Sequence, residues 1–517
     1  MEYLPRFPFR SFLAAALVSF AVPAGAQPST SIMGSRVECT DGFADDFYCD
    51  SVNLLSLLHR NDLNTRALND LWGWTDPESG NEYALVGMWD GVAFVDVTDP
   101  INPVLIGTLP SHDSNASGVW RDLKVYDDHV FVVVDVYGSN GMQVFDLTEL
   151  RSHDGTEPVT FSETAHYDGI TEAHNIAINE DTGFAYLVGS ISDECGRGLH
   201  MVNIQDVLDP TYAGCFNDDR TGNAGNGYTH DVQCVIYNGP DDDYVGQEIC
   251  FGANVNSLSI ADVTDKDNPV AVSILKYPNV SYAHQGWLTD DHKYFLLNDE
   301  ADEANGSTTG TRTLILDVID LDDPVSIEPY VSSLASTDHN LYIVGDYVFE
   351  ANYMSGLRIL DISDIYDPKE VGWFDTEPNN DDTGYDGAWS VYPFFQSGTV
   401  IVSSQELGLF VLEPVDIVAV ASTDEPIEVP AKFALSSGHP NPFNPSTALT
   451  LFLPEAQSVH VAVYDLAGRE IALLHDGPLP AGAHMLRFDA GHLTSGTFLI
   501  RATGPATIKT TMVTLAK

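Results

Sequence analysis

Short runs of β-branched and aromatic residues, divided by Gly, Asn, Asp and Pro, fill most of the chain before residue 414. Almost no stretch shows the helical period of apolar positions, so the pattern predicts strands. One clear unit has expected strands at 122–125, 129–134 and 141–146. In other units an acidic turn ending in Pro, such as Asp96–Pro100 or Asp361–Pro368, leads to a fourth, outer strand. Asp side chains bond nearby backbone N–H groups in turns, and Pro is tolerated mainly at strand edges.

This strand pattern returns seven times at nearly constant spacing. Its anchor positions are separated by 49, 53, 56, 54, 55 and 50 residues, and they are Trp72, Arg121, His174, His230, His284, His339 and Trp389. Repeats of about 40–50 residues are typical of propeller blades, so the sequence predicts an all-β, seven-bladed β-propeller. The ring closes either through the segment before Trp72 or through a strand of the final repeat, such as 407–412, and the sequence leaves both open.

A second domain follows the repeats. Residues 413–432 combine three prolines with acidic and small residues, which is typical of a linker. Beyond it, apolar or alternating runs between Gly and Pro turns predict a small C-terminal β-sandwich; they lie at 449–453, 459–464, 470–474, 484–488 and 497–501. The expected divisions are a signal peptide at 1–26, an N-terminal segment at 27–69, the propeller at 70–414, a linker at 415–432 and the sandwich at 433–517.

Residues 1–26 are typical of a secretory signal peptide. Arg6 and Arg10 precede an apolar run over 12–22, and small residues at 24–26 offer a cleavage site. A membrane-spanning helix needs about 20 apolar residues, and this run is shorter. No other stretch approaches that length, so we expect no transmembrane helix after removal of the signal.

The chain has six cysteines, which in an exported protein suggest three disulfides. Their positions suggest local pairs without proving connectivity, and free buried thiols are the alternative. The suggested pairs are Cys39 with Cys49, Cys195 with Cys215, and Cys234 with Cys250. No pair has the CxxC spacing that zinc clusters prefer. We expect the first pair to staple the segment before the first blade.

Acidic residues outnumber basic ones by 76 to 22, which gives a net charge of −54. Residues 27–430 carry −56, because the signal peptide and the tail from 431 each contribute +1. Such a surface repels nucleic acid and anionic membranes, so we expect no nucleic-acid partner. Adaptation to concentrated salt and a cation-binding surface both explain the charge. We favour salt adaptation because the acids are scattered through many loops.

Four successive anchors are histidines followed by a polar residue. Because the innermost strand of each blade begins at the mouth of the central channel, we expect these side chains to converge there, with carboxylates from the ends of second strands around them. Imidazoles beside carboxylates can hold a divalent metal such as zinc or calcium, or can run acid–base steps. The ligand-binding candidates are Trp72, Arg121, His174, His230, His284, His339, Trp389, Asp299, Glu300 and Glu350. The four histidines are also the metal-ligand candidates.

A structural role for these histidines competes with a site, and we favour the structural role. Propellers also use His at strand starts to bond the backbone of the next blade, and a repeated residue is what a repeated structural role produces. Ring nitrogens that converge on one point would favour a site, whereas nitrogens bonded to neighbouring backbone would favour the structural role. The chain has no GxSxG elbow, HExxH pair or phosphate-binding Gly loop, which argues against catalysis.

Three acidic loops contain the residue types of calcium ligands, at 241–243, 298–303 and 379–382. None has the spacing of a dedicated loop such as the EF-hand. We therefore expect solvated turns at these positions.

Three motifs mark the tail: PNPFNPST at 440–447, VYDLAGR at 463–469 and SGTF at 495–498. With them, nearly all of 433–517 resembles the C-terminal sorting domains of the type IX secretion system. The resemblance implies that outer-membrane secretion machinery exports the protein, and that it is secreted or displayed on the cell surface. An accessory adhesive or fibronectin-like sandwich is the alternative.

The body of the chain, roughly 36–414, resembles the choice-of-anchor B family, whose propeller is built from LVIVD-type repeats. The resemblance rests on segments such as Trp120–Asp122, Thr229–Cys234, Asp338–Tyr342 and Gly387–Ser390. The family name records a shared extracellular body joined to different anchoring tails, and it assigns no reaction. We expect a propeller that presents a binding face to an unknown extracellular protein or glycan. A metal-assisted hydrolase that uses the His and carboxylate cluster, or a structural surface-layer component, are the alternatives.

Overall fold

The computed structural model describes residues 27–115, 117–118, 120–135, 138–190, 195–222, 225–380, 382–415, 417, 433–435, 443, 446–453, 457–464, 468–479, 482–490, 493–505 and 507–517. The predicted signal peptide and most of the predicted linker lie outside these residues. The chain forms two compact units, Met1–Asp416 and Ile417–Lys517.

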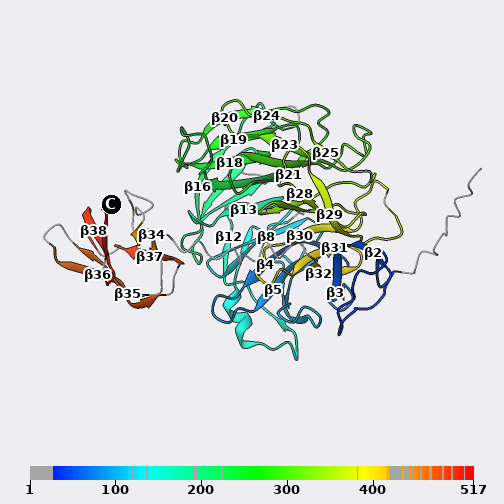
Figure 1. Cartoon of the computed structure of the whole chain (residues 1–517), viewed down its shortest axis with the longest axis horizontal. Coiled ribbons are helices and arrows are strands. Elements are labelled where there is room, and N and C mark those ends of the chain that lie inside the picture. The colour runs from blue at the N-terminus through cyan, green and yellow to red at the C-terminus, as the bar shows by residue number, and fades with distance from the viewer. Residues whose placement is uncertain are drawn as a thin grey trace, which may run out of the picture. The chain divides into compact units, whose positions relative to one another are not determined.

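The first unit consists of seven sheets, as the strand repeat predicts (Figure 1). The strands of each sheet are given from the innermost outward. The first sheet contains β4 (Leu68–Thr75), β5 (Glu82–Met88), β6 (Gly91–Asp96), β7 (Val104–Pro110) and β11 (Val159–Thr160), and the second contains β8 (Arg121–Tyr126), β9 (His129–Val134), β10 (Met142–Asp146) and β12 (Ala165–Tyr167). The third contains β13 (Asn175–Asn179), β14 (Phe184–Val188), β15 (Leu199–Asn203) and β16 (Thr211–Phe216), and the fourth contains β17 (Asp231–Ile236), β18 (Glu248–Ala253), β19 (Leu258–Asp262) and β20 (Val270–Leu275).

The fifth sheet contains β21 (Ala283–Leu288), β22 (Tyr294–Asp299) and β23 (Arg312–Asp317), with β24 (Val325–Ser326) and β25 (Tyr330–Val331) both paired to β23. The sixth contains β26 (Leu341–Val344), β27 (Tyr347–Ala351), β28 (Leu357–Asp361), β29 (Lys369–Phe374), β2 (Phe47–Asp50) and β1 (Phe43–Ala44). The seventh contains β30 (Ala388–Tyr392), β31 (Val400–Ser404), β32 (Gly408–Pro414) and β3 (Val52–His59). We number the seven sheets as blades 1 to 7 in the order of their innermost strands. The one described helix in this unit is the short 3-10 segment η1 (Leu147–Ser152).

The innermost strands form a closed ring. Each of β4, β8, β13, β17, β21, β26 and β30 contacts the next one, and β30 contacts β4. In Figure 1 the labelled members of this set lie near the centre, with β16, β20, β24 and β29 farther out. The all-β, seven-bladed propeller is therefore confirmed.

The N-terminal segment closes the ring. Strand β3 pairs antiparallel with β32 as the outermost strand of blade 7, with Leu57 opposite Phe410 and Leu58 opposite Leu409. The three inner strands of that blade come from the last repeat. Both possibilities that the sequence left open therefore contribute to one sheet, which joins the two ends of the repeat region.

Apolar side chains fill the space between neighbouring blades. Between blades 1 and 2, for example, Phe94 and Phe145 stack with ring centroids 4.9 Å apart, and both are fully buried beside Leu85 and Val130. Because each blade is sandwiched between two others, most of its strand positions are buried on both faces. This explains the continuous apolar runs in the sequence.

Three disulfides are present, and all are local. Cys39 bonds Cys49, Cys195 bonds Cys215, and Cys234 bonds Cys250 across the β17–β18 pair. No described cysteine is free. Disulfides of this kind persist in oxidising compartments outside the cytosol.

The second unit is a small β-sandwich. One sheet contains β33 (Ala434–Leu435), β34 (Ser446–Leu453) and β37 (Gly482–Asp489); the other contains β36 (Glu470–Leu479), β35 (Gln457–Tyr464), β38 (Gly496–Thr503) and β39 (Ile508–Leu515). Leu451 and Phe488 from the first sheet pack in one core with Val461 and Ile500 from the second. The alternating pattern did not reveal β39, which the structure adds at the edge.

Within the described ranges, no helix has the length and apolar character that a membrane span requires.

Candidate functional site

Four imidazole rings form a continuous arc at one end of the central channel. We call His174, His230, His284 and His339 the histidine arc, and the end of the channel where they lie the histidine mouth. Neighbouring ring centroids are 4.4, 4.2 and 4.3 Å apart. Each histidine lies within two residues of the start of the innermost strand of its blade, from blade 3 to blade 6. The repeat spacing therefore places four rings side by side.

Hydrogen bonds at Nδ1 fix the orientation of three of these rings. His230 donates to the backbone carbonyl of His284 at 3.0 Å, and His339 donates to that of Trp389 at 2.5 Å. His174 Nδ1 lies 2.7 Å from Oδ2 of Asp135. Because a carbonyl only accepts, Nδ1 of His230 and His339 carries the proton, and Nε2 of each neutral ring keeps its lone pair.

Glu300 faces two of the remaining nitrogens. It follows β22 directly, and its Oε2 lies 3.7 Å from Nε2 of His284, while its Oε1 lies 3.9 Å from Nε2 of His339. The hydroxyl of Tyr353 donates to Oε1 of Glu300 at 2.8 Å and orients the carboxylate. The structural role at Nδ1 and a convergent site at Nε2 therefore occur together in the ring of His339.

Burial keeps His230, His284 and His339 neutral. The pKa values of His230 and His284 lie well below the ordinary value because of burial and then because of neighbouring histidines, and burial lowers the pKa of His339 to about 3. Burial also raises the pKa of Glu300 to about 6, against the opposing effect of its bond from Tyr353. Neutral imidazoles suit metal binding because no proton competes for the lone pair.

His284, Glu300 and His339 can together hold a metal ion. One ligand atom from each lies within 4.8 Å of the others. Ligands bound at about 2.1 Å to a tetrahedral zinc are separated by about 3.4 Å, so small side-chain movements would complete the coordination. Two nitrogens and one carboxylate suit zinc or a similar transition metal better than calcium, which prefers oxygen.

Two of the other predicted site residues have clear positions near this end. The ring of Trp389 lies 5.0 Å from that of His339. Arg121 is 1% exposed, and its guanidinium donates to the carbonyl of Met88 and to Oγ of Ser111 at 3.1 and 2.8 Å. Arg121 thus joins blade 2 to blade 1.

The expected position of Trp72 is corrected by the structure. Strand β4 begins at Leu68, so Asn69 occupies the position that corresponds to the histidines. The same bond in three blades supports this alignment, because Asp70, Asp122 and Asp231 each accept from the backbone N–H of the next residue. Trp72 lies three residues, or about 10 Å, farther along its strand.

Asp299 and Glu350 have structural partners away from the arc. Asp299 accepts hydrogen bonds from the hydroxyl of Tyr277 and from the backbone N–H of Ser281 and Tyr282, which shapes the loop before β21. Glu350 is fully buried between β27 and β23. It accepts from Thr313 and Asn352 and does not face the imidazoles, contrary to expectation.

Tyrosines form part of the mouth that sequence reasoning missed. The ring of Tyr282 lies 5.3 Å from that of His230, and the ring of Tyr353 lies 4.5 Å from that of His339. The ring of Tyr228 lies 6.3 Å from that of His230. The sequence contained a signal for Tyr228 and Tyr282, since a Tyr-x-His triplet occurs at 228–230 and again at 282–284. Nothing in the repeat pattern pointed to Tyr353.

Below the histidines, polar side chains link the inner strands across the channel. Asn340 of blade 6 donates to Asp70 of blade 1 at 3.3 Å, and within β8 Lys124 lies 2.6 Å from Asp122. Burial and then Asp122 raise the pKa of Asp70 to about 7, while burial and then Asp122 raise that of Asp231 well above its ordinary value. The channel interior thus concentrates carboxyl groups around one lysine.

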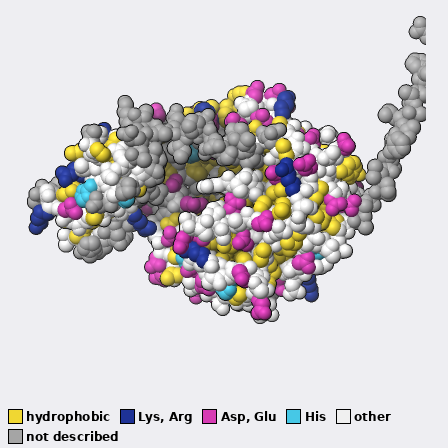
Figure 2. All heavy atoms as spheres, turned by 60° about the horizontal axis from the view of Figure 1, so that its bottom comes forward, with side chains coloured by type: hydrophobic (Ala, Val, Ile, Leu, Met, Phe, Trp, Pro, Cys, Tyr) yellow, Lys and Arg dark blue, Asp and Glu magenta, His cyan; other side chains and the backbone are white. Residues whose placement is uncertain are grey.

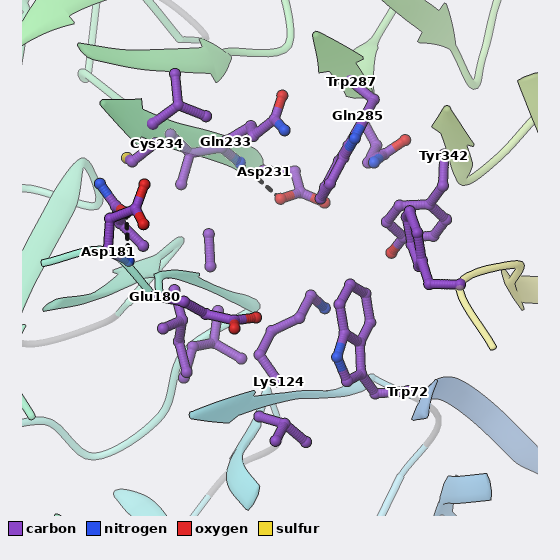
Figure 3. Close-up of a pocket in the computed structure, with 18 of the residues that line it drawn as sticks. Trp72, Lys124, Glu180, Asp181, Asp231, Gln233, Cys234, Gln285, Trp287 and Tyr342 are labelled. Carbon is purple, nitrogen blue, oxygen red and sulfur yellow. Dashed lines mark hydrogen bonds between the residues drawn. The ribbon is translucent and has the colours of Figure 1, made fainter. Parts of the chain in front are cut away.

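The opposite end of the channel opens into a cavity of about 540 Å³ (Figure 3). In Figure 3, Lys124 and Trp72 rise from one side, and Asp231 and Gln285 lie across from them. The ammonium of Lys124 lies 4.7 Å from the centroid of the Trp72 ring. The lining also includes Ala177, Glu180, Asp181, Gln233, Trp287, Tyr342, Tyr392 and Phe394. We call this end the aromatic mouth.

A small residue creates the space at the aromatic mouth. In each inner strand, one side chain lies three residues after the position that corresponds to the histidines. These side chains are Trp72, Lys124, Ala177, Gln233, Trp287, Tyr342 and Tyr392. Trp72, Trp287 and Tyr342 pack against one another or against Phe394 on one side, with ring centroids 5.0 to 6.1 Å apart. Ala177 leaves the other side unfilled. A pocket of this size, with aromatic walls and a few polar groups, is typical of small-ligand sites.

Comparisons with known proteins give limited information. No protein-family model matches the chain. A search of curated proteins also gives no match.

Solved structures give weak likenesses at 12% sequence identity. PorZ, described as an essential bacterial surface component of the type-IX secretion system of Porphyromonas gingivalis, aligns over 87% of this chain and 59% of its own, with a TM-score of 0.42. A Lactobacillus plantarum protein aligns over 82% of this chain and 99% of its own, with a TM-score of 0.40. A functionally unknown protein from Desulfotomaculum acetoxidans aligns over 64% and 90%, with a TM-score of 0.42. Likenesses at this level carry no inference about the function of this chain.

Proposed function

We propose that this chain is an exported binding protein whose propeller holds one divalent transition-metal ion at the histidine mouth. The observation that carries the proposal is the approach of Nε2 of His284 and His339 to the Glu300 carboxylate, at 3.7 and 3.9 Å. Hydrogen bonds that orient two of the ligands are also in place, since His339 donates to the backbone carbonyl of Trp389 and the hydroxyl of Tyr353 donates to Glu300. Three protein ligands would leave a coordination position for a further ligand.

Metal binding by the purified mature protein tests this proposal. We expect zinc titration against a competing chelator to give one tight site per chain. Glu300→Gln removes a charged ligand while keeping its shape, so it should weaken zinc binding by about 100-fold or more. His284→Gln should have a similar effect, and both variants should keep the wild-type circular dichroism spectrum.

His112→Gln is the matched control. His112 stacks on His166 with ring centroids 3.8 Å apart and lies 2.6 Å from Glu163, so these residues present the same chemical groups outside the histidine arc. This variant should bind zinc like the wild type. Unchanged affinity in Glu300→Gln, or loss of the site in His112→Gln, would show that zinc binds elsewhere.

Metal-assisted hydrolysis is the second candidate, and the three-ligand arrangement favours it. Two histidines and one glutamate with a water in the fourth position also form hydrolytic zinc sites. Screening the zinc-loaded protein against esters, peptides and polysaccharides tests this activity. Turnover that Glu300→Gln abolishes would support an enzyme, and turnover that survives in Glu300→Gln would point to a contaminant.

We also propose that residues 433–517 direct export through a type IX secretion system, on the basis of the three sequence motifs in the tail. In a bacterium with that system, the full chain should reach the cell surface or the medium. A chain that ends at residue 432 should stay in the periplasm. Surface delivery of the shortened chain would contradict this role.

A further inference from the structure

A second acidic cluster lies inside the protein. Asp302 and Glu303 belong to the loop between β22 and β23, and Asp338 precedes β26. One oxygen from each carboxylate lies within 4.8 Å of the others. The three residues are 0%, 8% and 2% exposed. The expected solvated turn at 298–303 is therefore wrong for this part of the loop.

One guanidinium faces these carboxylates within the described part of the chain. Arg312 contacts Asp302 at 2.5 Å and Asp299 at 3.7 Å, and it also donates to two backbone carbonyls. Four acidic side chains thus surround one basic one. The carboxylates outnumber the guanidinium, so a further positive charge would be attracted to the cluster.

Among the described residues, several carboxylate oxygens of the cluster accept no hydrogen bond from a donor outside the cluster. They include both oxygens of Glu303, Oδ1 of Asp302 and Oδ1 of Asp338. The other oxygen of Asp338 accepts from the backbone N–H of Arg312 at 3.0 Å. Burying carboxylate oxygens without partners costs free energy, which a cation at their centre would offset.

We propose that Asp302, Glu303 and Asp338 bind one calcium ion. Calcium takes six to eight oxygens at about 2.3–2.6 Å, so ligands on opposite sides of the ion lie up to about 5 Å apart. The carboxylate oxygens all lie within 4.8 Å of one another, which is compatible with that span. Magnesium demands near-ideal octahedral geometry and usually keeps several waters, which suits a buried cluster of protein carboxylates less well. Each of the three carboxylates offers at least one oxygen, Glu303 can offer both, and the ligand set contains no nitrogen or sulfur that zinc would prefer.

The ion would join two blades. Asp302 and Glu303 extend from blade 5, whereas Asp338 belongs to blade 6. The same two segments carry Glu300 and His339 of the histidine mouth. Calcium therefore holds the loop of one blade against the first strand of the next, whether or not the histidine mouth binds metal.

Thermal unfolding of the mature protein, first treated with a chelator and then given calcium, tests this site. Calcium in excess should raise the Tm by several degrees, because a ligand that binds only the folded state stabilises it. Equilibrium dialysis in concentrated NaCl, which suppresses loose association with the acidic surface, should give one calcium per chain. Glu303→Gln keeps the side-chain shape and should lose both the bound calcium and the Tm shift.

Asp320→Asn is the matched control, because Asp320 forms another cluster of three carboxylates with Asp241 and Asp322, partly or fully exposed. It should bind and respond to calcium like the wild type. Glu300→Gln should also keep the calcium response, which separates this site from the proposed transition-metal site. An absence of calcium binding by the wild type would mean that protons neutralise the buried acids. That result, or a calcium response that survives in Glu303→Gln, would overturn the proposal.

Discussion

The two nitrogens of a single imidazole have separate roles in this propeller. Nδ1 of His230 and His339 bonds the backbone of the next blade, while Nε2 of His339 faces Glu300. A histidine can do both because a neutral ring has one donor and one acceptor on opposite edges. A repeated structural bond therefore orients a ligand atom, and the structural role does not argue against a site.

At the same scale, Asp70 should make the stability of the propeller depend on pH. Burial and then Asp122 raise its folded pKa to about 7 against the attraction of Lys124, so ionisation disfavours the folded state. The free energy of unfolding should fall as the pH rises from about 4 to about 7. Asp70→Asn removes this penalty and should stabilise the protein at about pH 8 by up to about 4 kcal/mol. Urea unfolding across this range measures the effect.

The exposed carboxylate of Asp46 provides the comparison. Asp46→Asn should keep the pH profile of the wild type. A stability difference between Asp70→Asn and the wild type that stays constant from about pH 5 to about pH 8 would contradict the assignment.

Among the elements, β3 has a special position because it joins the first part of the chain to the last blade. It pairs with β32 over nearly its whole length, and its residues are buried. Besides this pairing, the N-terminal segment joins the end of the repeat region through β2, which pairs with β29 of blade 6 over a shorter stretch. Stability of the whole ring should therefore be sensitive to this one strand.

Leu57→Ala tests the closure. Leu57 is fully buried in β3, so truncation should lower the free energy of unfolding by about 2–5 kcal/mol. Chemical unfolding followed by tryptophan fluorescence measures the change. Leu208 is 59% exposed, and Leu208→Ala should change stability by less than about 0.5 kcal/mol. Equal effects of the two substitutions would mean that β3 does not hold the ring.

At the scale of the whole molecule, charge governs the surface. Acidic side chains lie scattered over the visible propeller face in Figure 2, among apolar and uncharged groups. A net charge of −54 gives strong self-repulsion at low ionic strength. Counterions in concentrated salt screen it, because the Debye length falls to about 3 Å at about 1 M salt.

The Tm should therefore rise by several degrees as NaCl increases from about 0.01 M to about 1 M. A chelator in every sample separates screening from binding at the proposed calcium site. KCl should produce the same rise, because screening depends on ionic strength. A Tm that stays constant over this range would rule out salt adaptation as the reason for the acidic composition.

The repeat pattern predicted the ring and the meeting of the four histidines, because blade spacing alone decides which residues begin an inner strand. It misplaced Trp72, since the first repeat has no histidine to fix its register and an aromatic residue took the anchor position. It also missed the aromatic mouth, where residues three positions after the anchors come together. Their types differ from blade to blade, so no repeated letter marked them.

By itself the sequence determined the strand type, the number of blades and, in every blade but the first, the residues at the start of the inner strand, because these depend on local periodicity and spacing. Only the tertiary structure decided which nitrogen of each histidine faces a neighbour, that Ala177 opens a cavity, and that Asp338 joins Asp302 and Glu303 inside the protein. Such contacts depend on side-chain directions and on segments more than 30 residues apart. Folding brings these segments together, and no local pattern encodes their meeting.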